Sequence, residues 1–378
     1  MTFTNTAKLA TQLALLAMSL SLVGCNKDSA PTTSPQAQQT ATPAGTDYSL
    51  IDKKIANKGE LPTWIIPNMP ESAEAYYGPD SYHVIAQTQD PDAVPPSHAR
   101  AAGGALTWIT TDDGKTKWRI NDRGQDACSF IMPDNKHVVY TSTRDNLDVP
   151  VGNWSSEDDY PQGAELYIAD LKDGGNIKRL THNDVYDAEV SVSPDGTKIV
   201  FTRQIDGMLD IWMMNADGTN EQQITFTPDW QEGAPFFLPD SKTLTMRAWK
   251  RKDPNAQDTG HSMTMMTVFT VDTDTKKITP ITDDEWMNWA PYPTPDGKHY
   301  VFVRPLADNP RNWEIFLGRI DGSAPPRRLT FNDSFDGFPS VSPDGTKMLF
   351  TRSTGKRFMS DLYTYVMDIS TLNLGPGQ

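Results

Sequence analysis

Short runs of alternating apolar and polar residues dominate the chain from about residue 70 to residue 370. In one stretch, AEVSVSPDG (188–196) is followed by KIVFTR (198–203), LDIWMMN (209–215) and, after the turn ADGTN (216–220), QQIT (222–225). Alternation with a period of two is typical of β-strands that have one buried face. Pro, Asp and Gly between the runs favour tight turns. The pattern predicts four antiparallel strands joined by short turns.

The same unit recurs six times along the chain. Each copy is marked by a Pro-Asp turn, and successive markers are 45 to 61 residues apart: Pro79, Pro133, Pro194, Pro239, Pro295 and Pro343. One four-stranded sheet per repeat is typical of a propeller blade. We therefore predict an all-β fold, a six-bladed β-propeller of four-stranded antiparallel blades over residues 76–378. The apolar run LPTWIIP (61–67) lies outside the repeats, and residues 48–75 either stand apart or supply a strand that closes the ring.

The repeat resembles that of the TolB-like β-propeller family. The shared features are the SPDG turn, a DG turn about two dozen residues later, and a closing Leu-Thr or Ile-Thr pair. In this chain the closing pairs are Leu180-Thr181, Ile224-Thr225, Ile281-Thr282 and Leu329-Thr330. The resemblance covers roughly residues 71–370. It implies the fold and says little about activity, because these residues shape turns and packing.

Residues 1–24 have the features of a targeting segment. Lys8 precedes an apolar stretch (9–23) that is too short to span a bilayer with normal flanks. The stretch ends Leu-Val-Gly-Cys, which resembles the bacterial lipoprotein processing box. That resemblance implies cleavage before Cys25 and lipidation of Cys25. The alternative is an ordinary secretory signal with a chance cysteine. The Asn after Cys25 favours, by resemblance to lipoprotein sorting, the outer membrane, and we expect the protein to face the periplasm.

Residues 25–47 are rich in Ser, Thr, Pro, Ala and Gln and are predicted to form a disordered tether from the lipidated Cys25. The formal net charge of -15 disfavours contact with nucleic acid and with anionic lipid headgroups. We therefore expect membrane contact through the lipid anchor only. With Cys25 lipidated, Cys128 is the remaining cysteine, and we predict that it is a small buried core residue.

The topology of a blade predicts two different faces. The Pro-Asp and DG turns share one face, and the connections between second and third strands lie on the other. Long insertions after Thr88, Thr143, Trp249 and Arg304 should gather on that second face, where binding residues usually occur. The same face should carry six candidate binding aromatics: Trp154, Trp230, Trp249, Trp286, Trp289 and Trp313. These either form a surface for a protein or a glycan, or cover the rims of adjacent blades.

A second constellation lies seven residues before each marker proline. With Ser72 in the first copy, its members are Asp126, Asp187, Glu232, Asn288 and Asp336, a candidate polar ring at the channel mouth. Carboxylates brought together in this way can chelate Ca²⁺. Alternatively, they satisfy backbone N–H groups where blades meet. Arg203, Arg304 and Arg352 end their second strands on the same face and are possible partners.

The sequence contains no nucleophile elbow, zinc-protease motif, CxxC pair or phosphate-binding loop, and no cofactor or catalytic residue is predicted. The leading hypothesis is a lipid-anchored module that binds an envelope protein or glycan on its loop-rich face. The alternative is a carbohydrate-active or metal-dependent enzyme with its site at the channel mouth. Oligogalacturonate lyases share a similar propeller, but the histidines and metal they use have no matching arrangement here. A structural subunit of an envelope complex is a third interpretation.

Overall fold

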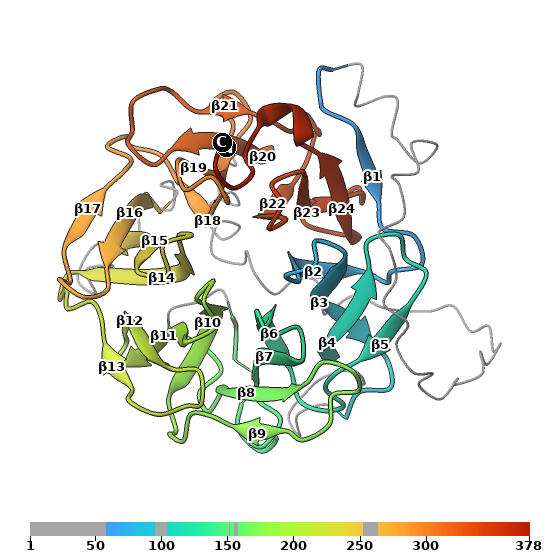
Figure 1. Ribbon diagram of the computed structural model, residues 1–378, viewed down its shortest axis with the longest axis vertical. Helices are drawn as coiled ribbons and strands as arrows, with labels where there is room; N and C mark the ends of the chain where they lie inside the picture. Colours follow the sequence, from blue (N-terminus) through green and yellow to red (C-terminus); the bar gives the residue numbers. More distant parts are fainter. Residues whose placement is uncertain (1–57, 95–103, 151, 155–157, 252–263) are drawn as a thin grey trace, which may run out of the picture.

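Six sheets arranged around a central axis make up the described part of the chain (Figure 1). The computed structural model describes residues 58–94, 104–150, 152–154, 158–251 and 264–378. Each sheet has four antiparallel strands, and the one helical element among these residues is a short 3-10 turn, Ser370–Leu372. The predicted six-bladed β-propeller is confirmed. No helix within these ranges is long and apolar enough to cross a membrane, and Cys25 with its flanking segments lies outside them.

The blades follow one another in sequence order. The first blade consists of β2 (Ser72–Tyr77), β3 (His83–Asp90), β4 (Gly104–Thr111) and β5 (Lys117–Arg119). The second consists of β6 (Asp126–Ile131), β7 (His137–Ser142), β8 (Glu165–Asp170) and β9 (Lys178–Arg179). The third consists of β10 (Tyr186–Val192), β11 (Lys198–Ile205), β12 (Met208–Asn215) and β13 (Gln222–Gln223). The fourth blade consists of β14 (Trp230–Phe237), β15 (Thr243–Lys250), β16 (Thr267–Asp272) and β17 (Ile278–Pro280). The fifth consists of β18 (Trp289–Pro293), β19 (His299–Pro305), β20 (Trp313–Arg319) and β21 (Arg327–Arg328).

The sixth blade combines both ends of the described chain. Its first three strands are β22 (Asp336–Val341), β23 (Lys347–Ser353) and β24 (Leu362–Asp368), and its outermost strand is β1 (Thr63–Ile65). β1 pairs antiparallel with β24, Thr63 opposite Met367, so the apolar run near residue 64 closes the ring (Figure 1). The predicted boundary between residues 75 and 76 is wrong, because it falls inside β2.

The marker turns hold themselves together with side-chain hydrogen bonds. In the third blade Asp195 accepts hydrogen bonds from the Ser193 hydroxyl (2.6 Å) and from the Thr197 backbone N–H (2.9 Å). Gly196 has φ +73°, a conformation that L residues with side chains adopt rarely. These contacts explain why Ser, Asp and Gly recur at this point in the repeat.

Every innermost strand carries a β-bulge five residues before its marker proline. The bulged residues all have positive φ although none is glycine: Glu74, Cys128, Glu189, Ala234, Ala290 and Phe338. A bulge bends a strand and redirects its side chains. Because the innermost strands surround the axis, these six residues form a layer around the channel.

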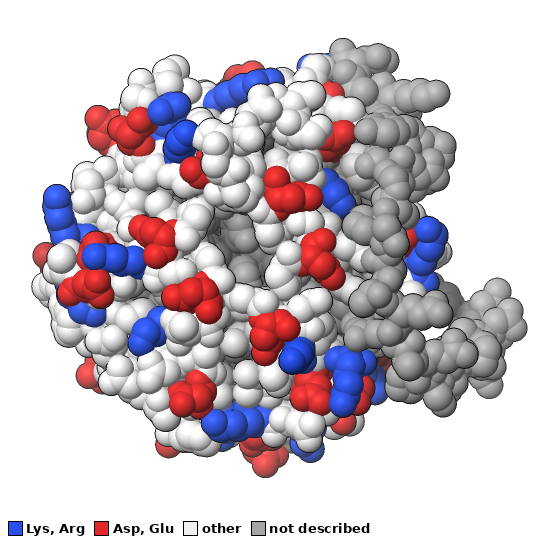
Figure 2. Space-filling model, viewed as in Figure 1, with Lys and Arg blue, Asp and Glu red and all other residues white. Residues whose placement is uncertain are grey.

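The disc has a turn face and a loop face. The turn face carries the marker turns, and the loop face carries the connections between second and third strands and between blades. The chain ends on the turn face, where the Asp296 N–H donates to the Leu374 carbonyl (3.0 Å). The C-terminus is drawn toward the viewer in Figure 1, so Figure 2 shows the turn face, with acidic side chains around a central hollow.

Candidate functional site

The predicted polar ring lies buried where strands and blades meet. Its members are Asp126, Asp187, Glu232, Asn288 and Asp336, and each is at most 2 % exposed. Two of them make paired hydrogen bonds with an arginine on the neighbouring strand. Arg203 donates to both oxygens of Asp187 (2.6 and 2.7 Å), and Arg352 donates to both oxygens of Asp336 (2.8 and 2.6 Å). These arginines hold the first and second strands of a blade together.

Two ring positions lack an arginine opposite them. Ser142 faces Asp126 and Ala248 faces Glu232 across the strand pair. Asp126 instead accepts from the Thr107 backbone and hydroxyl, both at 2.8 Å. Burial raises the pKa of Asp126 to about 6 and that of Glu232 to about 7, because these sites supply no positive charge.

The ring is therefore a set of strand-to-strand contacts rather than an open site at the channel mouth. Side chains engaged with arginines and threonines in separate junctions do not converge on one point. Within the described ranges, no group of three His, Cys, Asp or Glu side chains is arranged to hold a metal ion. Of the two interpretations drawn from the sequence, the contacts favour the structural one.

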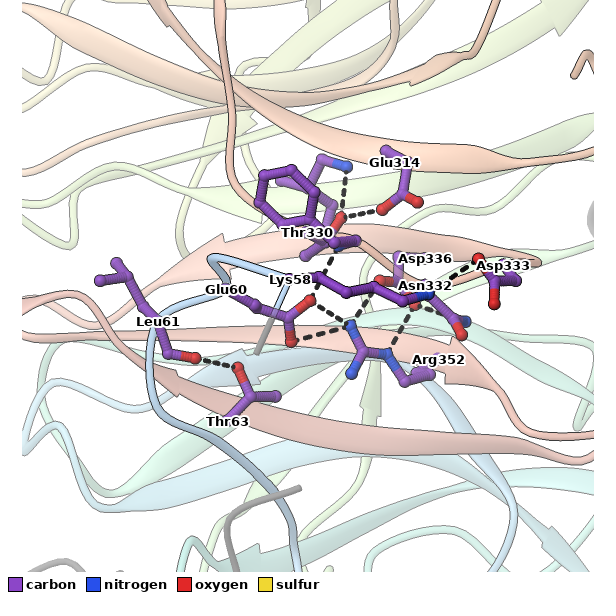
Figure 3. Close-up of polar contacts among 12 residues, drawn as sticks. Lys58, Glu60, Leu61, Thr63, Glu314, Thr330, Asn332, Asp333, Asp336 and Arg352 are labelled. Carbon is purple, nitrogen blue, oxygen red and sulfur yellow. Dashed lines mark hydrogen bonds and ion pairs between the residues drawn. The ribbon is translucent and has the colours of Figure 1, made fainter. Parts of the chain in front are cut away.

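The largest buried ionic cluster joins the N-terminal segment to the last blade. Arg352 donates to both oxygens of Glu60 (3.0 Å each) as well as to Asp336, and its side chain is only 2 % exposed (Figure 3). Glu60 also accepts from the Phe331 backbone N–H (2.8 Å). The Glu314 carboxyl lies in the same neighbourhood and accepts from the Thr330 hydroxyl (2.6 Å). The cluster fastens the segment that precedes β1.

Four of the six candidate binding tryptophans are buried, which for these four favours the alternative that they cover the rims of adjacent blades. Trp289 and Trp313 pack with Phe335 in a core cluster between the fifth and sixth blades. Trp154 and Trp249 belong to a second cluster near the loop face. The remaining two, Trp230 and Trp286, are half-buried. Large apolar rings are stabilised more by covering blade junctions than by contact with water.

Two aromatic residues from the insertion of the second blade pack against the third blade. Tyr160 stacks on Tyr186 with ring centroids 4.5 Å apart, and Trp154 lies 5.9 Å from the same ring. Both belong to the insertion between β7 and β8, whereas Tyr186 begins the innermost strand of the third blade. This part of a predicted binding loop therefore packs against the innermost strand of the third blade.

Deeper in the channel lie three polar bulged residues, Glu74, Cys128 and Glu189, which we call the polar layer. Cys128 donates through its backbone N–H (3.0 Å) and its thiol (3.2 Å) to Glu74 Oε2. Glu189 accepts from the Ala234 N–H (2.8 Å) and pairs with Arg247 (2.5 Å). Cys128 is half-buried and packs against the core cluster of the second and third blades, so the prediction of a buried core residue is met only in part. Burial, followed by the Glu74 charge, raises the pKa of this thiol well above its usual value.

An aromatic layer lies next to the polar layer, on the side of the turn face. Tyr76, Phe130, Phe236 and Tyr292 sit three residues before their marker prolines. Their rings meet across the axis: Tyr76 of the first blade lies 5.7 Å from Phe236 of the fourth and 6.0 Å from Tyr292 of the fifth. Rings of distant blades are thus in contact across the axis at this level.

Sequence reasoning did not identify the polar and aromatic layers. Their residues share fixed offsets from the marker prolines, so the repeat does contain a signal. The signal is weak because the six bulge positions hold Glu, Cys, Glu, Ala, Ala and Phe, and nothing in those residue types indicates positive φ.

Exposed apolar side chains concentrate on the loop face. Among the described residues, five large hydrophobic side chains are exposed, and four of them lie in loop-face connections or at their edges: Val94, Ile205, Phe226 and Met265. Phe226 is 66 % exposed. The fifth, Ile177, lies on the turn-face side, just before β9. An exposed apolar side chain in these connections can contribute to contact with another macromolecule.

The fold and its two faces define a TolB-like six-bladed β-propeller. TolB from Acinetobacter baumannii superposes with a TM-score of 0.53 at 18% identity, covering 77% of this chain and 64% of that one. A candidate TolB from Agrobacterium tumefaciens gives 0.52 at 18% identity, covering 81% and 96%. The chain thus spans less than two thirds of the Acinetobacter protein. At this identity the likeness is one of fold.

In sequence, the chain is 27% identical over 211 residues to an uncharacterized protein of Agrobacterium fabrum strain C58. The match covers 51% of this chain and 67% of that protein. No protein-family model matches the chain.

Proposed function

We propose that this protein is a binding module of the bacterial cell envelope that holds a protein partner on its loop face. It is anchored by lipid at Cys25 and tethered through residues 25–47. The observation that carries the proposal is that Val94, Ile205, Phe226 and Met265 are all exposed and all lie in loop-face connections or at their edges. Burial of each exposed apolar side chain against a partner lowers the free energy of the complex.

Support also comes from the fold. TolB proteins of two species share it, and a rigid disc presents its loops in fixed positions. The chain's overall negative charge disfavours nucleic acid as the partner. A surface of aliphatic side chains and one phenyl ring suits a protein better than a glycan, which stacks on flat aromatic rings beside hydrogen-bonding groups.

The proposal is tested by capture from the detergent-solubilised envelope of the native host. Wild-type protein is compared with the double variant Ile205→Ser, Phe226→Ser, which removes two exposed apolar side chains from the third blade. We expect wild type to retain a stoichiometric protein partner and the double variant to retain at least tenfold less, because burying these side chains supplies a large part of the binding energy.

Two further variants serve as controls. Ile177→Ser removes an apolar side chain of similar exposure from the turn face and should retain the partner. Cys25→Ser should leave the membrane fraction but still bind, which separates anchoring from recognition. Failure to recover any stoichiometric partner, or equal loss with Ile177→Ser, would contradict the proposal.

A further inference from the structure

The fifth blade carries an arginine bridge at its loop-face end. Arg328 on β21 donates to Glu314 Oε1 on β20 (2.6 Å) and to the Thr330 carbonyl (2.7 Å). Its guanidinium carbon lies 4.5 Å from the centre of the Phe331 ring. An aromatic face attracts a guanidinium, and a carboxylate adds a charge-assisted hydrogen bond. This blade therefore binds its arginine with an acid, a carbonyl and a ring.

The second blade repeats this bridge, because Arg179 donates to Glu165 Oε1, again at 2.6 Å. The strand pairing aligns the third blade with both. In each of the three blades a fourth-strand residue lies opposite an aromatic residue of the adjacent strand, and an acid precedes that aromatic residue by two positions. The aligned pairs are Tyr167–Arg179, Trp212–Gln223 and Phe316–Arg328. In the third blade, Asp210 is therefore the acid, and Gln223 takes the place of the arginine.

Asp210 has no positively charged partner within the described part of the chain. Its side chain is half-buried and interacts with the Thr227 backbone N–H and the Glu232 carboxyl. Arg203 lies opposite Asp210 in the strand pair, but its guanidinium binds two other acids. Burial accordingly raises the pKa of Asp210 above its usual value. A carboxylate in such a place is stabilised by a cation that reaches it.

The ring of Phe226 is uncovered for the same reason. Phe226 follows the closing Ile-Thr pair of its blade, as Phe331 follows the Leu-Thr pair of the fifth blade. Phe331 is half-buried beneath its arginine, whereas Phe226 is 66 % exposed. The next residue, Thr227, donates its backbone N–H to Asp210, which places the acid beside this connection. The third blade thus keeps the acid and the ring of the bridge without the arginine.

We propose that this place on the loop face binds an arginine side chain presented by the protein partner. The guanidinium would stack on Phe226 and pair with Asp210, in the way that the fifth blade binds its own arginine. A lysine fits less well, because only the planar guanidinium can stack on a ring and donate along its edge to an acid and a carbonyl. The inference rests on the proposed function, for which it names the chemistry of the partner. The site is open to solvent and requires no cavity.

The probe is the capped peptide acetyl-Gly-Arg-Gly-amide, titrated into the full chain at pH 8 and followed by the NMR shift of the Thr227 amide. We expect saturable binding to wild type and at least fivefold weaker binding to Asp210→Asn and to Phe226→Ser. Asn keeps an oxygen that can accept from Thr227, so Asp210→Asn should fold, and urea unfolding of each variant checks this. Acetyl-Gly-Lys-Gly-amide should bind at least threefold more weakly than the arginine peptide.

Gln223→Arg is the variant that tests the comparison between blades. It returns to the third blade the arginine that the second and fifth blades carry, so the new side chain should cover Phe226 and occupy the site from within. We expect a higher melting temperature and at least tenfold weaker binding of the arginine peptide. Gln222→Arg is the matched control, because neighbouring strand residues point to opposite faces of the sheet, and it should bind the peptide like wild type.

Capture from the detergent-solubilised envelope separates this inference from the proposed function. Gln223→Arg should retain at least tenfold less partner than Gln222→Arg. Equal peptide binding by wild type and Gln223→Arg, or no saturable shift with wild type, would overturn the arginine site even if a partner is captured. Saturable peptide binding that Asp210→Asn weakens, with no partner captured, would support the site and contradict only the proposed function.

Discussion

Single substitutions within the repeat decide the protonation of its buried acids. Asp187 and Asp336 face Arg203 and Arg352, and both acids are held by paired hydrogen bonds. At the equivalent place in the fourth blade the arginine is replaced by Ala248, and Glu232 accepts from the hydroxyls of Thr225 and Thr227 instead. Its pKa is raised to about 7, by burial and then by the charge of nearby Asp210.

The raised pKa of Glu232 predicts a pH-dependent stability. The folded protein keeps this proton up to about pH 7, whereas the unfolded chain releases it near the ordinary pKa of a glutamate, 4.5. Between about pH 4.5 and pH 7 the folded state therefore binds more protons than the unfolded state. The protonated Glu232 carboxyl contributes stability that is fully present below about pH 4.5 and is lost as the pH rises to 7. The shift corresponds to at most about 3 kcal/mol.

Glu232→Gln should remove this pH-dependent contribution to the stability of the fold. The free energy of unfolding, from urea titrations at pH 5 and pH 8, should fall less with pH in the variant. At pH 8 the variant should be the more stable protein, because a neutral amide can donate to Asp210. Exposed Glu285→Gln is the matched control and should behave like wild type. Equal pH dependence of wild type and Glu232→Gln would show that Glu232 is ionised in the folded state.

These contacts mark what the sequence could predict about the site. It placed the acids in register and suggested Arg203, Arg304 and Arg352 as partners, because all of them sit at fixed offsets from the marker prolines. It could not show that Trp289 is buried and Trp286 only half-buried, since side-chain burial depends on which blade covers which edge. The layer of bulged residues escaped prediction because a bulge with positive φ has no residue signature at Glu74 or Ala290.

At the scale of the strand, an arginine at the end of the second strand fixes the innermost strand. β10 is bulged near Glu189, so part of its ladder with β11 is shifted in register. Arg203 compensates beyond the bulge by binding Asp187 twice and Glu221 once (2.7 Å). Arg304 makes a similar bridge from β19 to Asn288 and Asp284. Strands that bend toward the channel are thereby held to their blades.

Arg203→Ala should destabilise the protein by about 3–5 kcal/mol, because it leaves Asp187 buried without its cation. The measurement is the free energy of unfolding in urea. Arg319→Ala is the control: Arg319 pairs with Asp321 on the surface, where water replaces the lost contact, and little change is expected. Similar effects of the two substitutions would mean that the buried pair contributes no more than an exposed one.

At the scale of the whole molecule, the ring depends on a strand from the opposite end of the chain. The run of residues 61–67 suggested such a strand from the sequence, but its pairing with β24 required the fold. Trp64 and Ile66, 5 % and 1 % exposed, pack with Leu349 and Val366 in one core cluster. Glu60 adds the buried contact with Arg352 (Figure 3). The sixth blade is thus held at both its inner and its outer edge.

Removing residues 58–70 should therefore open the ring and not merely shorten one blade. The last blade would lose its fourth strand and leave Arg352 with one acid fewer, and β24 would become an exposed edge. Burial of Trp64 alone is worth about 3–5 kcal/mol, so a fall in the melting temperature of more than about 10 °C is expected. A synthetic peptide of residues 58–70, added in excess, should restore much of the loss by pairing with β24. A chain lacking residues 1–57 but keeping β1 should melt like the full chain. Unchanged melting without residues 58–70 would show that the six blades hold together without this closing strand.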